Sequence, residues 1–68
     1  MRIISSDSSG ASVQLSASEL RMLNNAMNET LEALDNDDEF STRVGAERSE
    51  MSSLLDELHK LIVNLPAG

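Results

Sequence analysis

Apolar residues recur at helical spacing in two long stretches of the chain, and each stretch predicts a helix. In the first stretch the steps are three or four residues, through Leu20, Leu23, Met27, Leu31 and Leu34. At these steps the side chains share one face of a helix. The preceding residues Ser16 to Glu19 form an S-x-x-E capping box, which is a helix-start signal. We therefore expect a helix over 17–35.

The second stretch shows the spacing of a coiled-coil seam. Its seam positions alternate by three and four residues, at Met51, Leu54, Leu58, Leu61 and Leu65. Leu55 and Ile62 widen this stripe on one flank. Pro66 disfavours helical geometry at the residue before it. We expect a helix from about 46 to 64.

A polar connector separates the two stripes and carries its own helix signals. Asn36 or Asp37 is a suitable N-cap, and Gly45 can take the positive φ that often ends a helix. These residues predict a short helix over 37–44. Two stripes joined by a compact connector are expected to pack as an antiparallel helical hairpin.

The N-terminal segment has a different pattern. Ile3, Ile4 and Val13 are β-favouring, and a turn-type cluster at 7–10 lies between them. A short hairpin pairing about 2–5 with about 11–15 is one interpretation. The other is a flexible serine-rich arm, because an isolated two-stranded hairpin is marginal in water. We expect an all-α protein, with an arm of either kind over 1–15 and a helical domain over 16–65.

Composition narrows the possible functions. The 68 residues include 12 acidic and 5 basic side chains, one Phe, one His and no Cys, for a net charge of −7. One domain is the upper limit, and disulfide, zinc-ribbon and cysteine-nucleophile chemistry are excluded. Neither the charge nor the single aromatic residue suits nucleic-acid binding. With no long apolar segment at the N-terminus or elsewhere, we expect no membrane association and a cytoplasmic location.

The small size raises the question of what stabilises the fold. Below roughly 70–80 residues a single core rarely supplies more than about 3–5 kcal/mol. Disulfides are impossible without cysteine, so regular helix packing or a companion chain must contribute. We expect self-association, as a dimer, through the seam positions Met51, Leu54, Leu58, Leu61 and Leu65, or burial of that stripe by another protein.

Catalytic chemistry lacks a convincing site. His59 is the only side chain that normally titrates near neutral pH, and Ser52, Ser53 and Asp56 lie on the same predicted helix. A serine-histidine-aspartate site needs groups that converge from several directions, together with oxyanion donors, which one helix does not readily supply. We expect a non-enzymatic protein.

A metal site is only partly suggested by the connector acids. Asp35, Asp37 and Glu39 follow the spacing that opens an EF-hand loop. However, Phe40 occupies the position of the required glycine, and Ala46 occupies that of the bidentate glutamate. These acids are better interpreted as part of the helix connector, with a weak Mg²⁺ or Ca²⁺ contact as a minor alternative, and we expect no dedicated metal site and no cofactor.

The segment 40–54 resembles the middle of a helix-turn-helix, with Gly45 at its turn. A DNA-reading helix must present basic and amide side chains at its start. Here Glu47 and Glu50 flank Arg48, so phosphate would meet two carboxylates. A small transcriptional regulator using 40–54 is therefore the alternative function and not the leading one.

Half of the acidic residues cluster in a run without Lys or Arg, which we call the acidic lobe. It comprises Glu29, Glu32, Asp35, Asp37, Asp38 and Glu39. The lobe is either a solvated face that maintains solubility or a docking surface for a basic partner. Asn24, Asn28 and Arg43 are structural or contact residues near it. We expect a protein-binding module: a small acidic inhibitor, immunity-type protein or adaptor for a more basic protein.

Overall fold

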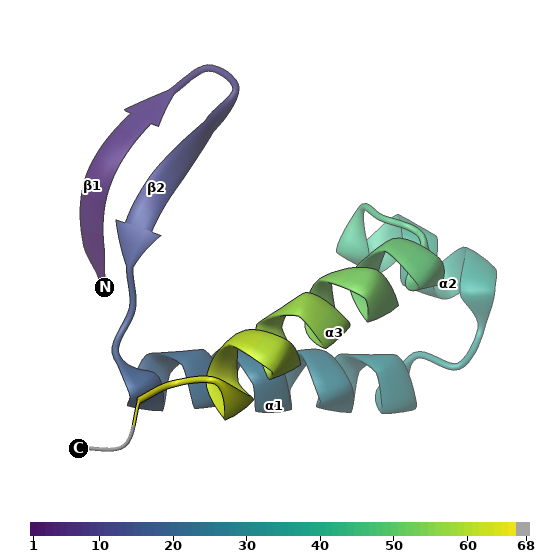
Figure 1. Cartoon of the computed structure of the whole chain (residues 1–68). Helices are drawn as coiled ribbons and strands as arrows, with labels where there is room; N and C mark the ends of the chain where they lie inside the picture. Colours follow the sequence, from purple (N-terminus) through teal and green to yellow (C-terminus); the bar gives the residue numbers. More distant parts are fainter. Residues whose placement is uncertain (67–68) are drawn as a thin grey trace.

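The computed structural model describes residues 1–66, in which a β-hairpin precedes three helices (Figure 1). The elements in chain order are β1 (Arg2–Asp7), β2 (Gly10–Gln14), α1 (Ala17–Ala33), α2 (Asp37–Val44) and α3 (Arg48–Val63). Helices hold 62% and strands 17% of the described chain. The predicted all-α class is therefore wrong, and the fold is an α+β mixture. Both strands lie within the predicted arm, and all three helices lie within the predicted helical domain.

Local capping signals set the helix boundaries. The Ser16 hydroxyl accepts from the Glu19 amide at 3.1 Å, and the Glu19 carboxylate accepts from the Ser16 amide at 2.9 Å. The Asn36 side chain accepts from the Glu39 amide at 3.0 Å to start α2. Gly45 ends α2 with a φ of 80°. These contacts confirm the predicted capping box and glycine stop, and of the two predicted cap candidates for α2 the structure uses Asn36 rather than Asp37.

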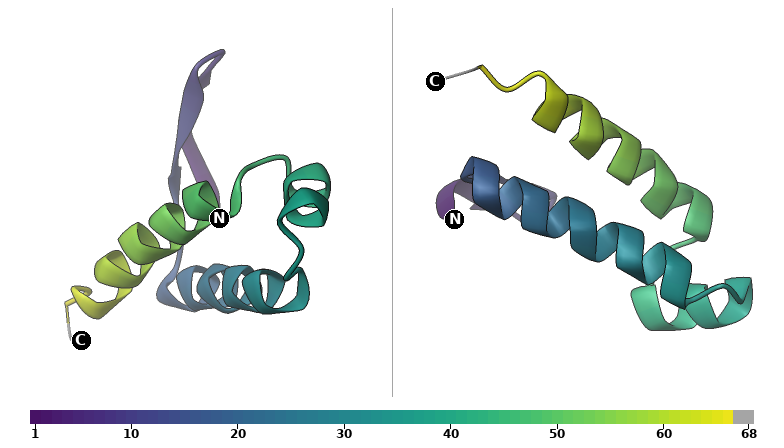
Figure 2. Two further views of the ribbon diagram at one scale, coloured as in Figure 1. Left: turned by 90° about the vertical axis from the view of Figure 1, so that its right-hand side faces the viewer. Right: turned by 90° about the horizontal axis from the view of Figure 1, so that it is seen from below.

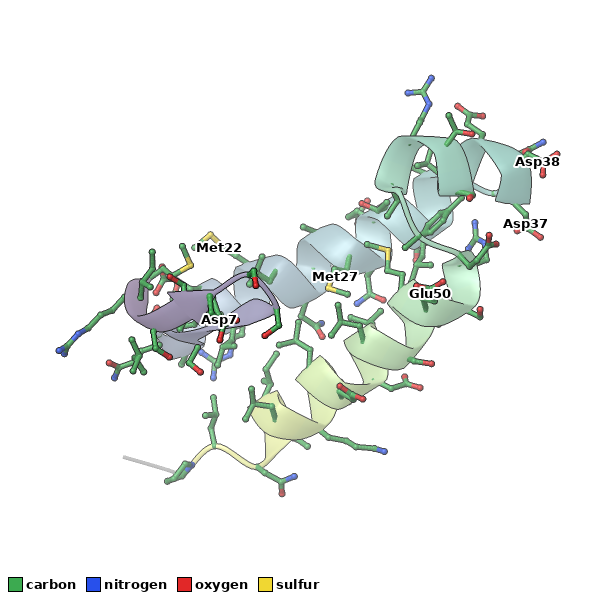
Figure 3. The ribbon with its side chains drawn as sticks, turned by 90° about the horizontal axis from the view of Figure 1, so that it is seen from above. Asp7, Met22, Met27, Asp37, Asp38 and Glu50 are labelled. Atoms are coloured by element: carbon green, nitrogen blue, oxygen red, sulfur yellow. The ribbon has the colours of Figure 1, made fainter. Side chains whose placement is uncertain are left out.

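The helices form an antiparallel pair with α2 at its connecting end. α1 and α3 run in opposite directions beside each other, and α2 lies where they are joined (Figures 1 and 2). Met27 of α1 lies between the two long helices (Figure 3). Among the described residues, Leu20 and Phe40 are the only buried hydrophobic side chains. The predicted helical hairpin is present, but its core is very small.

The apolar stripe of α3 is divided between two environments. Met51, Leu55, Leu58, Ile62 and Leu65 are half-buried. In contrast, Leu54 and Leu61 are 56% and 51% exposed. The predicted seam placed Leu54 and Leu61 at its centre and Leu55 and Ile62 on its flank. The structure reverses these roles. A second row of apolar residues, also spaced by alternating steps of four and three, includes Leu55 and Ile62, and this row lies on the more buried side of the helix.

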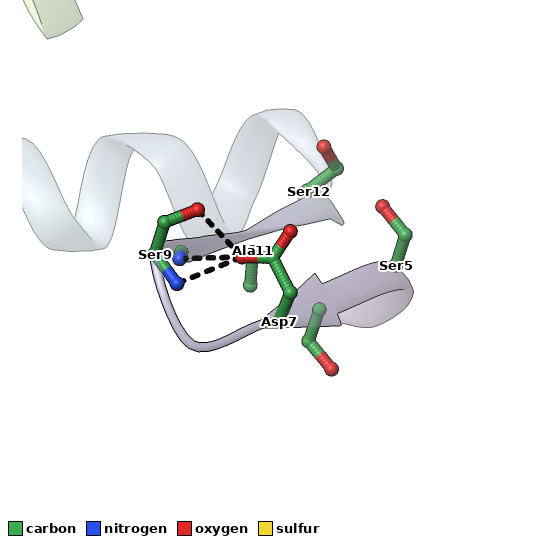
Figure 4. Close-up of a pocket in the computed structure, with 7 residues that line it drawn as sticks. Ser5, Asp7, Ser9, Ala11 and Ser12 are labelled. Atoms are coloured by element: carbon green, nitrogen blue, oxygen red, sulfur yellow. Dashed lines mark hydrogen bonds between the residues drawn. The ribbon is translucent and has the colours of Figure 1, made fainter.

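The hairpin is closed by one aspartate. The strands pair antiparallel from Arg2 with Gln14 to Asp7 with Gly10, with an irregularity between Ile3 and Ser5. One Asp7 carboxylate oxygen accepts from the Ser9 hydroxyl at 2.6 Å and from the Ser9 and Gly10 amides at 2.8 and 3.1 Å (Figure 4). These hydrogen bonds continue the pairing up to the turn, so β1 extends to Asp7 rather than to residue 5 as predicted, while β2 keeps the predicted length of five residues.

The molecule is extended for its length. Its radius of gyration is 13.7 Å, whereas a compact domain of this length has about 11 Å. Its principal extents are 40 × 31 × 16 Å, and the hairpin stands away from the helical pair (Figure 1). A chain of this shape leaves much of its apolar surface in contact with solvent.

Candidate protein-binding surfaces

The helical corner is organised around Arg48, the first residue of α3. Its Nη1 donates to the Leu31 carbonyl at 2.9 Å, and its Nη2 donates to the Leu34 carbonyl. The same guanidinium lies 5.0 Å from the centroid of the Phe40 ring. Its Nε lies 3.2 Å from Oδ1 of Asp37. Arg48 thereby connects the C-terminal end of α1, the start of α2 and the start of α3.

These contacts change the interpretation of the corner over 40–54. A cation beside the last carbonyls of a helix complements the helix dipole and satisfies acceptors that would otherwise lack partners. Arg48 is therefore occupied by internal contacts, while Glu47 and Glu50 remain exposed at the same helix start. The corner offers two carboxylates to its surroundings, and this geometry suits packing better than phosphate binding.

The acidic lobe lies at the end of the molecule where α1, α2 and their connector meet. Asp37 and Asp38 mark this end in Figure 3. Arg43 pairs with Glu39 at 2.9 Å, one turn away on α2, and Arg48 pairs with Asp37. Within residues 1–66 the remaining members make no ion pair: Glu29, Glu32, Asp35 and Asp38. All four are exposed, so the lobe retains uncompensated negative charge.

The two asparagines predicted beside the lobe have different surroundings. Asn28 is exposed, whereas Asn24 is half-buried in the middle of α1. The side-chain oxygen of Asn24 is buried and accepts no hydrogen bond within the described chain. Arg43, the third predicted contact residue, is mostly exposed and bound to Glu39. Arg43 is therefore linked to the acidic lobe through its ion pair with Glu39. Asn24, in contrast, is not part of the exposed surface of the lobe.

A second surface, which the sequence pattern did not indicate, lies at the base of the β-hairpin. We call it the hairpin-base groove; it has a volume of about 280 Å³ and is lined by Met1, Leu15, Glu19, Met22 and Leu23. Met22 is 61% exposed and Leu23 is 45% exposed. The helical period assigned Leu23 to the core together with Leu20, but Leu23 lines this groove and only Leu20 is buried.

Glu19 connects the hairpin to α1 at one wall of this groove. Its Oε2 lies 2.5 Å from the Met1 amino group, while its Oε1 accepts from the Ser16 amide. The N-terminal ammonium, followed by the Ser16 amide, lowers the pKa of the Glu19 carboxyl to about 2. One carboxylate therefore holds the first residue of the chain beside the first turn of α1.

Residues 1–66 contain no group of three or more His, Cys, Asp or Glu side chains arranged to hold a metal ion. His59 is exposed on α3. None of the described helices combines the length and apolar character needed to cross a membrane.

Comparison with family models, curated proteins and solved structures finds no match to this chain.

Proposed function

We propose that this protein is a non-enzymatic protein-binding module, acting as a small acidic inhibitor, immunity-type protein or adaptor on a more basic partner protein. The observation that supports this function most is the uncompensated charge of the acidic lobe. Residues 1–23 contain two basic and two acidic side chains, so the entire formal charge of −7 arises after residue 23. The cytoplasmic location expected from the sequence remains a prediction.

The lobe is suited to docking because its charge is both concentrated and supported by a defined corner. Charge of one sign increases the association rate with an opposite patch and disfavours partners of the same sign. Arg48 links the elements that carry the lobe, so less ordering of the backbone is needed on binding. Lysine or arginine side chains of the partner would pair with Glu29, Glu32, Asp35 and Asp38.

The proposal is tested by matched charge reversals on two different helices. Glu29→Lys with Glu32→Lys alters the lobe, and Asp56→Lys with Glu57→Lys alters α3 outside it. All four side chains are exposed and lack an ion pair within residues 1–66. Each reversal adds two charges, so both double variants carry −3 in place of −7.

The experiment begins with capture from the source cell, identification by mass spectrometry, and purification of the basic protein recovered. We expect the lobe variant to associate with it at least about tenfold more slowly at low salt, and the α3 variant to resemble wild type. Equal slowing by both variants would show that only total charge matters. Unchanged binding of the lobe variant, or recovery of acidic partners alone, would contradict the proposed function.

A further inference from the structure

The β-hairpin lacks the support that a two-stranded sheet normally requires. Two strands are marginal in water unless further strands or a helix cover them. Here β1 and β2 pair only with each other, and every residue in both strands is exposed. Extensive packing between elements is otherwise confined to α1 with α3 and α2 with α3. The hairpin therefore presents both faces and both edges to solvent.

Exposed apolar residues occur both on the hairpin and at its junction with α1. Ile3 and Val13 are directly paired across the strands, so their side chains share one face of the hairpin. They are 64% and 41% exposed. The hairpin-base groove, lined by Met22 and Leu23, follows at the junction with α1. Exposed apolar residues gathered at one end of a small domain are typical of an interaction site.

The charge distribution allows a second copy of the same chain to be the occupant. Residues 1–23, which we call the hairpin end, carry equal numbers of acidic and basic side chains. Two copies can meet there without the repulsion expected from a net charge of −7 each. The acidic lobe lies at the opposite end of α1, a helix about 25 Å long, so the two lobes remain apart.

The solvent-accessible surface area of the chain is larger than that of a compact monomer, as expected if part of the surface is normally covered by another copy. The chain exposes 5307 Å², whereas a compact monomer of 7.4 kDa exposes about 4,200 Å². The excess is therefore more than about 1,000 Å². A standard protein interface buries about 800 Å² on each partner, so an interface with a second copy would cover most of this excess.

We propose that the hairpin end forms a homodimer interface in which Ile3, Val13, Met22 and Leu23 of each copy are covered by the other. This inference does not depend on the proposed function, because the basic partner would bind the opposite end. The α3 stripe is the competing self-association surface. There, Glu57 lies one helical turn from both of the exposed residues Leu54 and Leu61, so two copies meeting on this face would bring like charges together.

Sedimentation equilibrium over a range of micromolar concentrations tests the interface with two matched variants. Val13→Lys with Met22→Lys alters the hairpin end, and Leu54→Lys with Leu61→Lys alters α3. Each replaces two exposed apolar side chains by lysine. We expect wild type and the α3 variant to dimerise, and the hairpin-end variant to dissociate with a dissociation constant raised at least about tenfold. Circular dichroism of each variant verifies that the helices are retained.

A monomeric wild type, or loss of the dimer in the α3 variant alone, would overturn the proposal. Hydrogen exchange of the wild-type chain supplies a measurement that needs no substitution. Amides over 2–14 should gain protection as concentration rises, while amides of the acidic lobe should not. Protection confined to α3, or protection independent of concentration, would also contradict the interface. Neither result would bear on binding of a basic partner to the acidic lobe.

Discussion

The guanidinium of Arg48 lies 5.0 Å from the centre of the Phe40 ring, the only fully buried large side chain in the described chain. The same group donates to the carbonyls of Leu31 and Leu34, which belong to the last part of α1 and its C-cap. A cation on an aromatic face contributes about 0.5–2 kcal/mol, more when solvent is excluded. The pair therefore joins the buried core to the carbonyl end of α1.

Arg48→Ala is expected to lower the free energy of unfolding by about 1–3 kcal/mol, because part-buried carbonyls lose their donors and Phe40 loses its cation. Arg48→Lys should recover only part of this loss, since an ammonium lacks the planar fork. Urea unfolding followed by circular dichroism measures both. The control is Arg43→Ala, which removes an exposed i,i+4 pair and should cost less than about 0.5 kcal/mol. Equal effects would refute the role assigned to Arg48.

Phe40→Ala should leave the chain largely unfolded. Truncating a buried phenylalanine costs about 3–5 kcal/mol, which equals the whole contribution expected from a core of this size. Phe40→Leu retains most of the apolar volume and should remain folded with a lower unfolding midpoint. Thermal unfolding of the two variants separates these outcomes. A cooperative transition of Phe40→Ala at the wild-type midpoint would show that the core lies elsewhere.

Gly45→Ala should destabilise the protein by about 1 kcal/mol, because a side chain is unfavourable at the φ of 80° that ends α2. Space is not the cause, since a Cβ at this position would contact nothing within 4 Å. Gly10→Ala offers the matched control: its surroundings are equally open and its φ is not in the left-handed region. Chemical unfolding should therefore distinguish the two variants, with Gly10→Ala changing stability by less than about 0.5 kcal/mol.

Stability is expected to depend on pH through Glu19. The N-terminal ammonium, together with the Ser16 amide, lowers the pKa of this carboxyl from 4.5 to about 2. As the pH falls, the Glu19 carboxyl therefore takes up a proton at a higher pH in the unfolded chain than in the folded chain. The stabilisation is complete above pH 4.5 and is lost as the pH falls through about 2. Glu19→Gln should flatten this part of the profile of unfolding midpoint against pH.

Acetylation of the amino group of Met1 supplies the control for the cause of the Glu19 pKa shift. It removes the ammonium but leaves the Ser16 capping contact in place. The carboxyl signal of Glu19, followed by NMR, should then titrate at higher pH than in the unmodified chain. An identical titration in both forms would show that the amino group does not cause the shift.

Signals that act within a few residues predicted the helices well. Ser16, Asn36 and Gly45 each satisfy or terminate backbone groups of their own helix turn, so their roles follow from adjacent sequence. The hairpin was harder to predict because its strands are short and polar. Its turn depends on three hydrogen bonds to one Asp7 oxygen, a contribution that hydrophobic spacing does not report.

The sequence by itself determined where the three helices lie and how charge is divided along the chain, because capping, period and composition are local properties. Only the tertiary structure decided which apolar residues are covered. Arg48 reaches carbonyls 14 and 17 residues earlier in the chain, and α3 turns Leu55 rather than Leu54 toward its more buried side. Such contacts depend on how helices are placed against one another, and several rotations of an amphipathic helix are compatible with the same leucine spacing.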